Sequence, residues 1–138
     1  MNTALNALLI GVAGACGAIC RYGLNGIATH PGLQGLAGGS PYLGTLLANC
    51  LGCALLGGVA EWLLIAAIQP ETGQERLFLA IRIGFLGSLT TFSTLIGESL
   101  QLSGSGRLAA GVGLLLVNTI TGIVLFLGTG YLVRSWAG

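Results

Sequence analysis

The hydrophobic pattern of the chain consists of four long apolar stretches separated by short polar segments. The stretches cover residues 3–24, 42–68, 77–102 and 108–133. A transmembrane helix needs about 20 consecutive, mostly apolar residues, and every stretch reaches that length. The pattern therefore predicts an all-α membrane protein, with four transmembrane helices in a single membrane domain that comprises residues 1–138.

The third apolar stretch contains an irregular segment, residues 84–94, with the sequence GFLGSLTTFST. Its two glycines and five serine or threonine residues make it a poor helix former. Because lipid cannot hydrogen-bond a freed backbone group, irregular chain at membrane depth survives only where it is buried in protein or lines a polar cavity. Membrane proteins also place ions at broken helices. We therefore expect the third helix to be broken here, and the break to be the functional site.

The composition is that of a chain that lies almost entirely in lipid. Hydrophobic residues make up 54% of the sequence and charged residues 7%, whereas about a quarter of a soluble domain is charged. The net charge is +1, and the chain contains no lysine. These values exclude a basic nucleic-acid-binding patch and a polybasic lipid anchor. Membrane lipid is therefore the expected surrounding, and nucleic acid is not an expected partner.

The arginines are divided almost evenly between the two sides of the membrane. Four spans place both termini on one side, together with Arg76, Arg82 and Arg134, and leave Arg21 and Arg107 near the other side. Orientation follows the asymmetry of arginine and lysine, and three against two is a weak bias. Two outcomes stay open: the chain inserts in both orientations, or the small bias still fixes one.

Glycine occurs 25 times in 138 residues, well above the average usage of about 7%. Many of these glycines lie within the apolar stretches. Helices in lipid are not driven together by hydrophobic burial, so small residues hold a bundle together by allowing close backbone contact. Four helices enclose little interior for a pore, which predicts that the protein is an oligomer.

The sequence offers little support for enzymatic chemistry. Its four cysteines form two closely spaced pairs, Cys16 with Cys20 and Cys50 with Cys53. Such pairs either bind a metal ion or serve as small hydrophobic residues, and glycine-rich apolar spans favour the second interpretation. There is no Ser/His/Asp set, phosphate-binding loop or carboxylate cluster. We therefore do not expect an enzyme.

Several polar residues lie inside the apolar stretches. Asn49 follows Thr45 by four residues, so the two side chains share one helix face. Asn118 and Thr121 lie within the fourth stretch. These groups either form hydrogen bonds between helices or, together with the broken third helix, form a polar track across the membrane.

Three motifs resemble the small bacterial fluoride channels, the Fluc family, over essentially the whole chain. They are GACGAICRYG at residues 14–23, GTLLANCLG at 44–52 and GFLGSLTTFSTLIGE at 84–98. The third motif is the specific one. The resemblance implies an antiparallel, dual-topology homodimer of four-helix subunits with two pores, in the bacterial inner (plasma) membrane. It also implies passive export of fluoride from the cytoplasm.

The resemblance further implies roles for individual residues. Main-chain carbonyls of Gly87 and Thr90 match those that hold a structural sodium ion (Na+) at the dimer interface. Arg21 matches the family's vestibule arginine, and Glu98 matches its glutamate after the motif. The implied ion pathway comprises Thr45, Asn49, Thr91, Phe92, Ser93, Leu95 and Asn118.

The chain departs from the family pattern at three positions. The family usually has a second phenylalanine where this chain has Leu95, and a serine where it has Asn118. It usually has a tyrosine where this chain has Leu114. The second aromatic contact to the ion is therefore missing from this sequence.

Elementary chemistry agrees with a fluoride pathway. Fluoride is small and tightly hydrated, so a narrow pore must replace its water with fixed donors. The Asn49 amide carries two N–H donors and each hydroxyl carries one, and the positive edge of the Phe92 ring favours an anion.

Two other function classes compete with the channel. A small proton-coupled multidrug exporter also has four spans, but it needs a carboxylate near the middle of the membrane, and Glu61 and Glu98 lie toward the ends of spans. A membrane scaffold without transport activity would leave the costly segment 84–94 without a purpose.

Overall fold

The computed structural model describes residues 3–33, 41–66 and 73–137, and every element in these ranges is helical. The elements are α1 (Thr3–Ala28), η1 (Pro31–Leu33), α3 (Pro41–Ala66), α4 (Gly73–Leu79), η2 (Ala80–Leu86), α5 (Gly87–Leu89), α6 (Phe92–Gly104) and α7 (Leu108–Ala137). Four segments, of 24 to 30 residues, are long and apolar enough to cross a membrane. The predicted all-α protein with four membrane-spanning helices is confirmed.

The four spans extend beyond the predicted ranges where the structure describes their ends. The first continues to Ala28, the third begins at Gly73 and the fourth continues to Ala137. Helical hydrogen bonding does not stop at the edge of the hydrocarbon, so hydropathy marks the apolar part of a helix and not its ends. The predicted end of the second span, at residues 67–68, lies outside the described residues.

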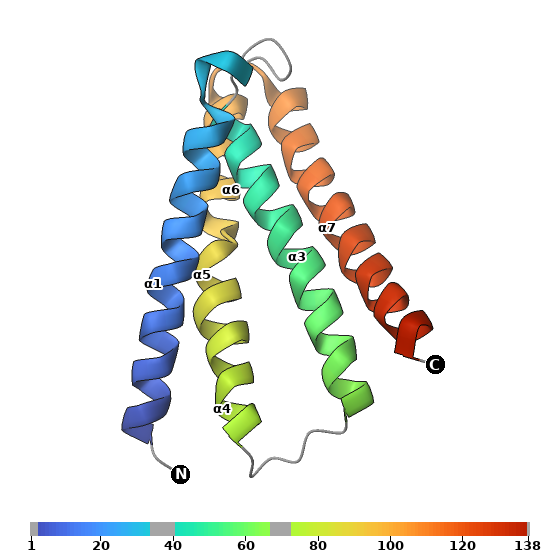
Figure 1. The fold of residues 1–138 in the computed structure, drawn as a ribbon. Helices are drawn as coiled ribbons and strands as arrows, with labels where there is room; N and C mark the ends of the chain where they lie inside the picture. Colours follow the sequence, from blue (N-terminus) through green and yellow to red (C-terminus); the bar gives the residue numbers. More distant parts are fainter. Residues whose placement is uncertain (1–2, 34–40, 67–72, 138) are drawn as a thin grey trace.

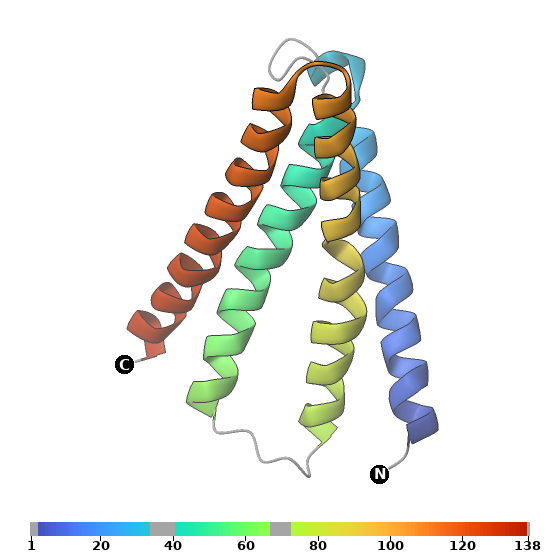
Figure 2. The same cartoon turned by 180° about the vertical axis from the view of Figure 1, so that it is seen from behind.

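The spans run alternately up and down, so both termini lie at the same end of the bundle (Figure 1). α3 packs along α7, and α1 contacts the first part of the third span, η2 above all. The last part of the third span, α6, packs instead on α7, as the view from behind shows (Figure 2). The third span therefore packs against α1 as far as α5 and against α7 from α6 onward.

Glycines allow the helices to meet backbone to backbone. A Cβ atom at Gly17 of α1 would collide with the main-chain carbonyl oxygen of Phe85 in η2, and a Cβ at Gly57 of α3 would collide with that of Phe126 in α7. The Thr129 hydroxyl donates to the Ala54 carbonyl across the same α3–α7 contact, at 2.8 Å. The expected role of the glycines in close helix packing is seen at these crossings.

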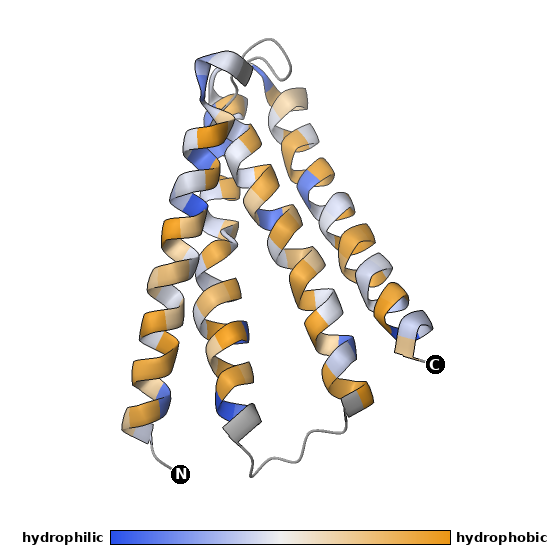
Figure 3. Cartoon of the chain, in the orientation of Figure 1, coloured by the Kyte–Doolittle hydropathy of each residue, from blue (hydrophilic) through white to orange (hydrophobic). Residues whose placement is uncertain are grey.

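Hydrophobic residues predominate along all four spans in the view of Figure 3. Large side chains such as Tyr22, Phe92 and Trp136 are more than two-thirds exposed, whereas Leu89 is fully buried. In the most apolar 18 residues of each span, only 6 to 33% of the residues are buried within the chain. Lipid or another apolar surface must cover the remainder, because exposed apolar area of this extent does not face water.

The third span changes its helical form twice. η2 is a π-helix, with five-residue hydrogen bonding, and it begins at Ala80. The backbone is extended only at Thr90 (φ −79°, ψ 155°) and Thr91 (φ −150°, ψ 106°). The irregular segment expected at 84–94 is thus a π-helix that starts earlier, followed by helix and by two extended residues.

Candidate functional site

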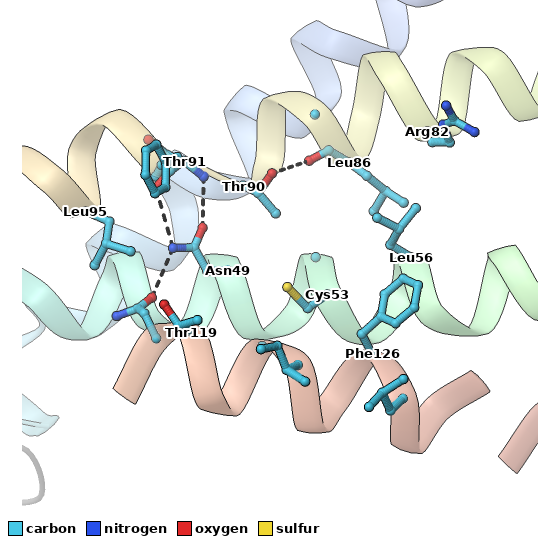
Figure 4. A pocket seen from close by; sticks show the side chains of 17 residues that line it. Asn49, Cys53, Leu56, Arg82, Leu86, Thr90, Thr91, Leu95, Thr119 and Phe126 are labelled. Atoms are coloured by element: carbon cyan, nitrogen blue, oxygen red, sulfur yellow. Dashed lines mark hydrogen bonds between the residues drawn. The ribbon is translucent and has the colours of Figure 1, made fainter. Parts of the chain in front are cut away.

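A groove of about 530 Å³ opens beside the two extended residues of the third span (Figure 4). Its walls come from α3, from the third span between η2 and α6, and from α7. The lining is mostly apolar and includes few polar groups. The lining residues are Asn49, Gly52, Cys53, Leu56, Arg82, Leu86, Gly87, Thr90, Thr91, Phe92, Leu95, Asn118, Thr119, Gly122, Ile123, Phe126 and Leu127.

Both polar atoms of the Asn49 side-chain amide form hydrogen bonds with the main chain of Thr91. Its Oδ1 atom accepts a hydrogen bond from the Thr91 N–H at 2.8 Å, and its Nδ2 atom donates to the Thr91 carbonyl at 3.5 Å. The Thr91 amide, which has lost its helical acceptor, is thereby satisfied inside an apolar bundle, where an unpaired group would cost several kcal/mol. Asn49 thus fixes the place where the helix stops.

Gly52 lets the extended residues approach α3. It lies almost one turn after Asn49, and a Cβ atom there would collide with the Thr90 methyl group. The Thr90 hydroxyl points away from this contact and donates to the Leu86 carbonyl at 3.0 Å. Thr90 therefore packs its methyl group on α3 and keeps its hydroxyl on its own helix.

Two main-chain carbonyls are released from the helical ladder at the same place. In an uninterrupted helix the Thr91 amide would donate to the Gly87 carbonyl and the Thr94 amide to the Thr90 carbonyl. Here the Thr91 amide donates to Asn49, and the Thr94 amide donates to the Thr91 hydroxyl at 3.3 Å. The carbonyls of Gly87 and Thr90, the two predicted cation ligands, thus lose these helical donors.

Asn118 of α7 completes the polar end of the groove. It is 4% exposed, and its Oδ1 atom accepts a hydrogen bond from Asn49 Nδ2 at 3.0 Å. Its own Nδ2 atom donates to the Leu114 carbonyl at 3.2 Å. Asn49 Nδ2 thus donates to two acceptors within the protein, the Thr91 carbonyl and Asn118 Oδ1. An anion that binds to this nitrogen has to replace one of these acceptors.

The predicted pathway residues do not all line the groove. Asn49, Thr91, Phe92, Leu95 and Asn118 do so. Phe92 is 75% exposed at the start of α6, whereas Leu95, one turn later, is 5% exposed. The aromatic ring is therefore free to face an ion or a second chain.

Four other predicted residues lie away from this groove. Thr45 is buried and donates to the Glu98 carboxylate at 2.8 Å, which joins α3 to α6. Within the described residues the second carboxylate oxygen of Glu98 is buried and has no hydrogen-bond partner. Ser93 is exposed and Arg21 is half-buried, and neither lines the groove. Their predicted roles stay predictions.

Several residues of the groove walls were not predicted from the sequence. On α3 the stripe Asn49, Gly52, Cys53 and Leu56 has the spacing of one helix face. Gly52, Cys53 and Leu56 follow Asn49 by three, four and seven positions, so this face can be read from the sequence. α7 continues the same pattern from Asn118 to Leu127.

Arg82 also lines the groove, although the sequence indicated only that it is one of three arginines on the side of the termini. The structure places it within η2, about 10 Å along the helix from Glu75, which lies in the first turn of the third span. An arginine at the centre of a span costs about 2.5–3.5 kcal/mol on insertion scales. A charged side chain on a span is a candidate functional residue for that reason.

The chain is similar to known proteins along most of its length. Residues 8–131 match the family described as CrcB-like protein, Camphor Resistance (CrcB). Curated relatives named fluoride-specific ion channel FluC include one from Rhodopirellula baltica, 41% identical over 92% of this chain and 92% of its own. Others are from Salinibacter ruber, 44% identical over 88% and 84%, and from Dehalococcoides mccartyi, 36% identical over 95% and 96%.

The hydrogen bonds of Asn49 generate a stability prediction. Asn49→Ala should lower the free energy of unfolding by about 1–3 kcal/mol, because it leaves the Thr91 N–H without its acceptor in an apolar setting. Thermal unfolding in detergent, followed by the fluorescence of Trp62 and Trp136, measures the change. Thr119→Ala is the matched control, since the Thr119 hydroxyl donates only to Leu115 of its own helix. Equal melting curves for both variants would contradict the assigned role.

Proposed function

Since the chain belongs to the CrcB family, we propose that it is a fluoride-selective ion channel that lets fluoride leave the bacterial cytoplasm passively. It is a multi-pass membrane protein and not an enzyme. The observation that carries the proposal is the similarity to fluoride-specific channels over nearly the whole chain, together with the break that Asn49 holds open inside the third span.

The site chemistry supports the transport of a small anion. Amide and hydroxyl groups of Asn49, Thr91 and Asn118 gather at one end of the groove, within apolar walls. Such donors replace the water of a compact ion, and a low dielectric strengthens each contact. The edge of the Phe92 ring adds a weakly positive surface.

The membrane potential supplies the driving force for export. It contributes about 2.3 kcal/mol per elementary charge per 100 mV, which favours the exit of an anion from a cytoplasm that is electrically negative. Hydrogen fluoride enters cells as a neutral acid and ionises inside, so a passive pore suffices to lower the fluoride concentration.

A proton-coupled multidrug exporter is the rival function, and it is not favoured. Such a carrier needs a carboxylate near the middle of a span. Among the described residues, Glu61 lies near the end of α3 and is paired with Arg134 at 2.7 Å. Glu75 lies at the start of the third span, and Glu98 lies toward its other end, six residues before Gly104.

Fluoride efflux from liposomes that contain the purified protein tests the function. Fluoride should leave quickly and chloride should be retained, as measured with ion-selective electrodes. Phe92→Ala should slow fluoride efflux about tenfold, the factor that corresponds to a lost contact of ~1.4 kcal/mol. Tyr131→Ala, which removes an aromatic side chain of similar exposure from α7, is the control. Equal efflux of the two halides would refute the proposal.

We further propose that the functional unit is an antiparallel homodimer of subunits inserted in opposite orientations. One subunit leaves the groove open and Phe92 exposed, so a second copy is needed to enclose a pathway. The three-against-two division of the arginines permits both orientations.

Labelling of a terminal residue tests the dual orientation. Ala137→Cys, in a background in which the four native cysteines are replaced by serine, adds no charge and so preserves the arginine balance. A membrane-impermeant thiol reagent should label about half of the molecules from each side of sealed vesicles. Labelling from one side alone would exclude this dimer.

We propose, last, that the carbonyls of Gly87 and Thr90 hold a structural sodium ion where two subunits meet. The residues fit such an ion: two carbonyls are freed from their helical donors, Gly87 is exposed, and hard oxygen ligands suit a hard cation. When bound, the ion would neutralise carbonyl dipoles that otherwise repel one another.

Removal of sodium tests this site. Purification with N-methylglucamine in place of sodium should weaken the dimer on size-exclusion chromatography and slow fluoride efflux. Gly87→Val should do the same in sodium, whereas Thr90→Ser should not, because the ligands belong to the main chain. Within one subunit a Cβ at Gly87 meets only the Arg82 carbonyl, at 3.7 Å. A loss of dimer therefore reports on the interface and not on the fold. An unchanged dimer without sodium would show that no cation is needed.

A further inference from the structure

Arg82 is the only charged residue among those that line the groove. It lies at the opposite end from Asn49 and Thr91, beyond Leu56 and Phe126 (Figure 4). That end is nearer the termini (Figure 1). The Arg82 guanidinium therefore places a positive charge at this end of the groove.

Arg82 faces the groove from within the π-helix η2. Arg82 and Gly87 both line it although five positions separate them, and the Gly87 amide donates to the Arg82 carbonyl. In an α-helix residues five apart point about 140° away from each other. In a π-helix, with bonds from i to i+5, they lie nearly on one face. The widened turn therefore aligns Arg82 with the extended residues at the break.

The charge of Arg82 is not neutralised within the described part of the chain. Arg134, at the same end of the bundle, pairs with Glu61 at 2.7 Å, and this is the only salt bridge in that part. Arg82 lies over the Phe78 ring, whose centroid is 5.7 Å from the guanidinium carbon. The guanidinium is exposed and keeps its hydrogen-bond donors available for an anion.

We propose that Arg82 is an anion-recruiting residue that concentrates fluoride at the termini-side end of the groove and supplies it to the polar end at Asn49 and Asn118. The inference rests on the proposed fluoride channel. The walls between the two ends, which include Leu56, Leu86 and Phe126, are apolar. A low-dielectric wall focuses the field of a single charge and raises the local concentration of its counter-ion.

Efflux at low and high ionic strength tests the proposal. Fluoride efflux of wild type, Arg82→Gln and Arg82→Lys should be compared in liposomes of neutral lipid, with impermeant gluconate salts setting the ionic strength. At about 10 mM ionic strength Arg82→Gln should be slower than wild type by about threefold to tenfold. The difference should shrink near 1 M, where the screening length is about 3 Å. Arg82→Lys should remain close to wild type.

Arg134→Gln is the matched control. It removes one arginine from the same end of the bundle, so any effect on membrane orientation is shared with Arg82→Gln, but it leaves the groove unchanged. Should Arg82→Gln fail to give folded protein on size-exclusion chromatography, Arg82→Met carries the same prediction, because its side chain suits a span.

Three results would overturn the role of Arg82. The first is equal efflux of Arg82→Gln and Arg134→Gln at low ionic strength. The second is a deficit of Arg82→Gln that salt does not change, since this would indicate a packing effect. The third is a deficit that appears only when anionic lipid is added, since Arg82 would then bind a lipid phosphate. Wild-type liposomes that release no fluoride would instead refute the channel itself, so the two failures are distinguishable.

Discussion

The pairing of one amide side chain with one peptide unit governs the rest of this structure. Asn49 accepts from the Thr91 N–H and so replaces the helical acceptor that this amide has lost, and it donates a second bond to the Thr91 carbonyl. Inside a bilayer a helix can be interrupted only where such substitutes exist. Asn118 holds the Asn49 amide in position from α7, so three of the four spans meet at this point.

The interruption directs the third span from one neighbour to another. Its first part packs against α1, where Gly17 and Gly84 allow backbone contact, and its last part packs against α7. The groove lies beside this change of partner. The same two extended residues release the carbonyls of Gly87 and Thr90, so an anion pathway and a cation site can arise from a single break.

The departures from the family pattern acquire a physical meaning in this arrangement. Asn118, where the family usually has serine, reaches Asn49 directly and is itself anchored on the Leu114 carbonyl. Leu95, where the family usually has phenylalanine, is almost fully buried and lines the groove. The polar end is thus braced by a longer side chain, while an apolar residue replaces one aromatic surface.

The sequence by itself determined the all-α class, the four spans and the neighbourhood of the interruption in the third span, because each follows from local properties. Hydropathy marks a span wherever about 20 apolar residues follow one another, and Thr90 and Thr91 stand out among their apolar neighbours. The three motifs likewise indicate the family, because each is a continuous run of residues.

Tertiary structure alone decided which polar groups meet. The bond between Asn49 and Thr91 joins residues 42 positions apart, and that between Asn49 and Asn118 joins residues 69 apart. The position of Arg82 was equally hidden, because hydropathy does not detect the π-helix on which it lies.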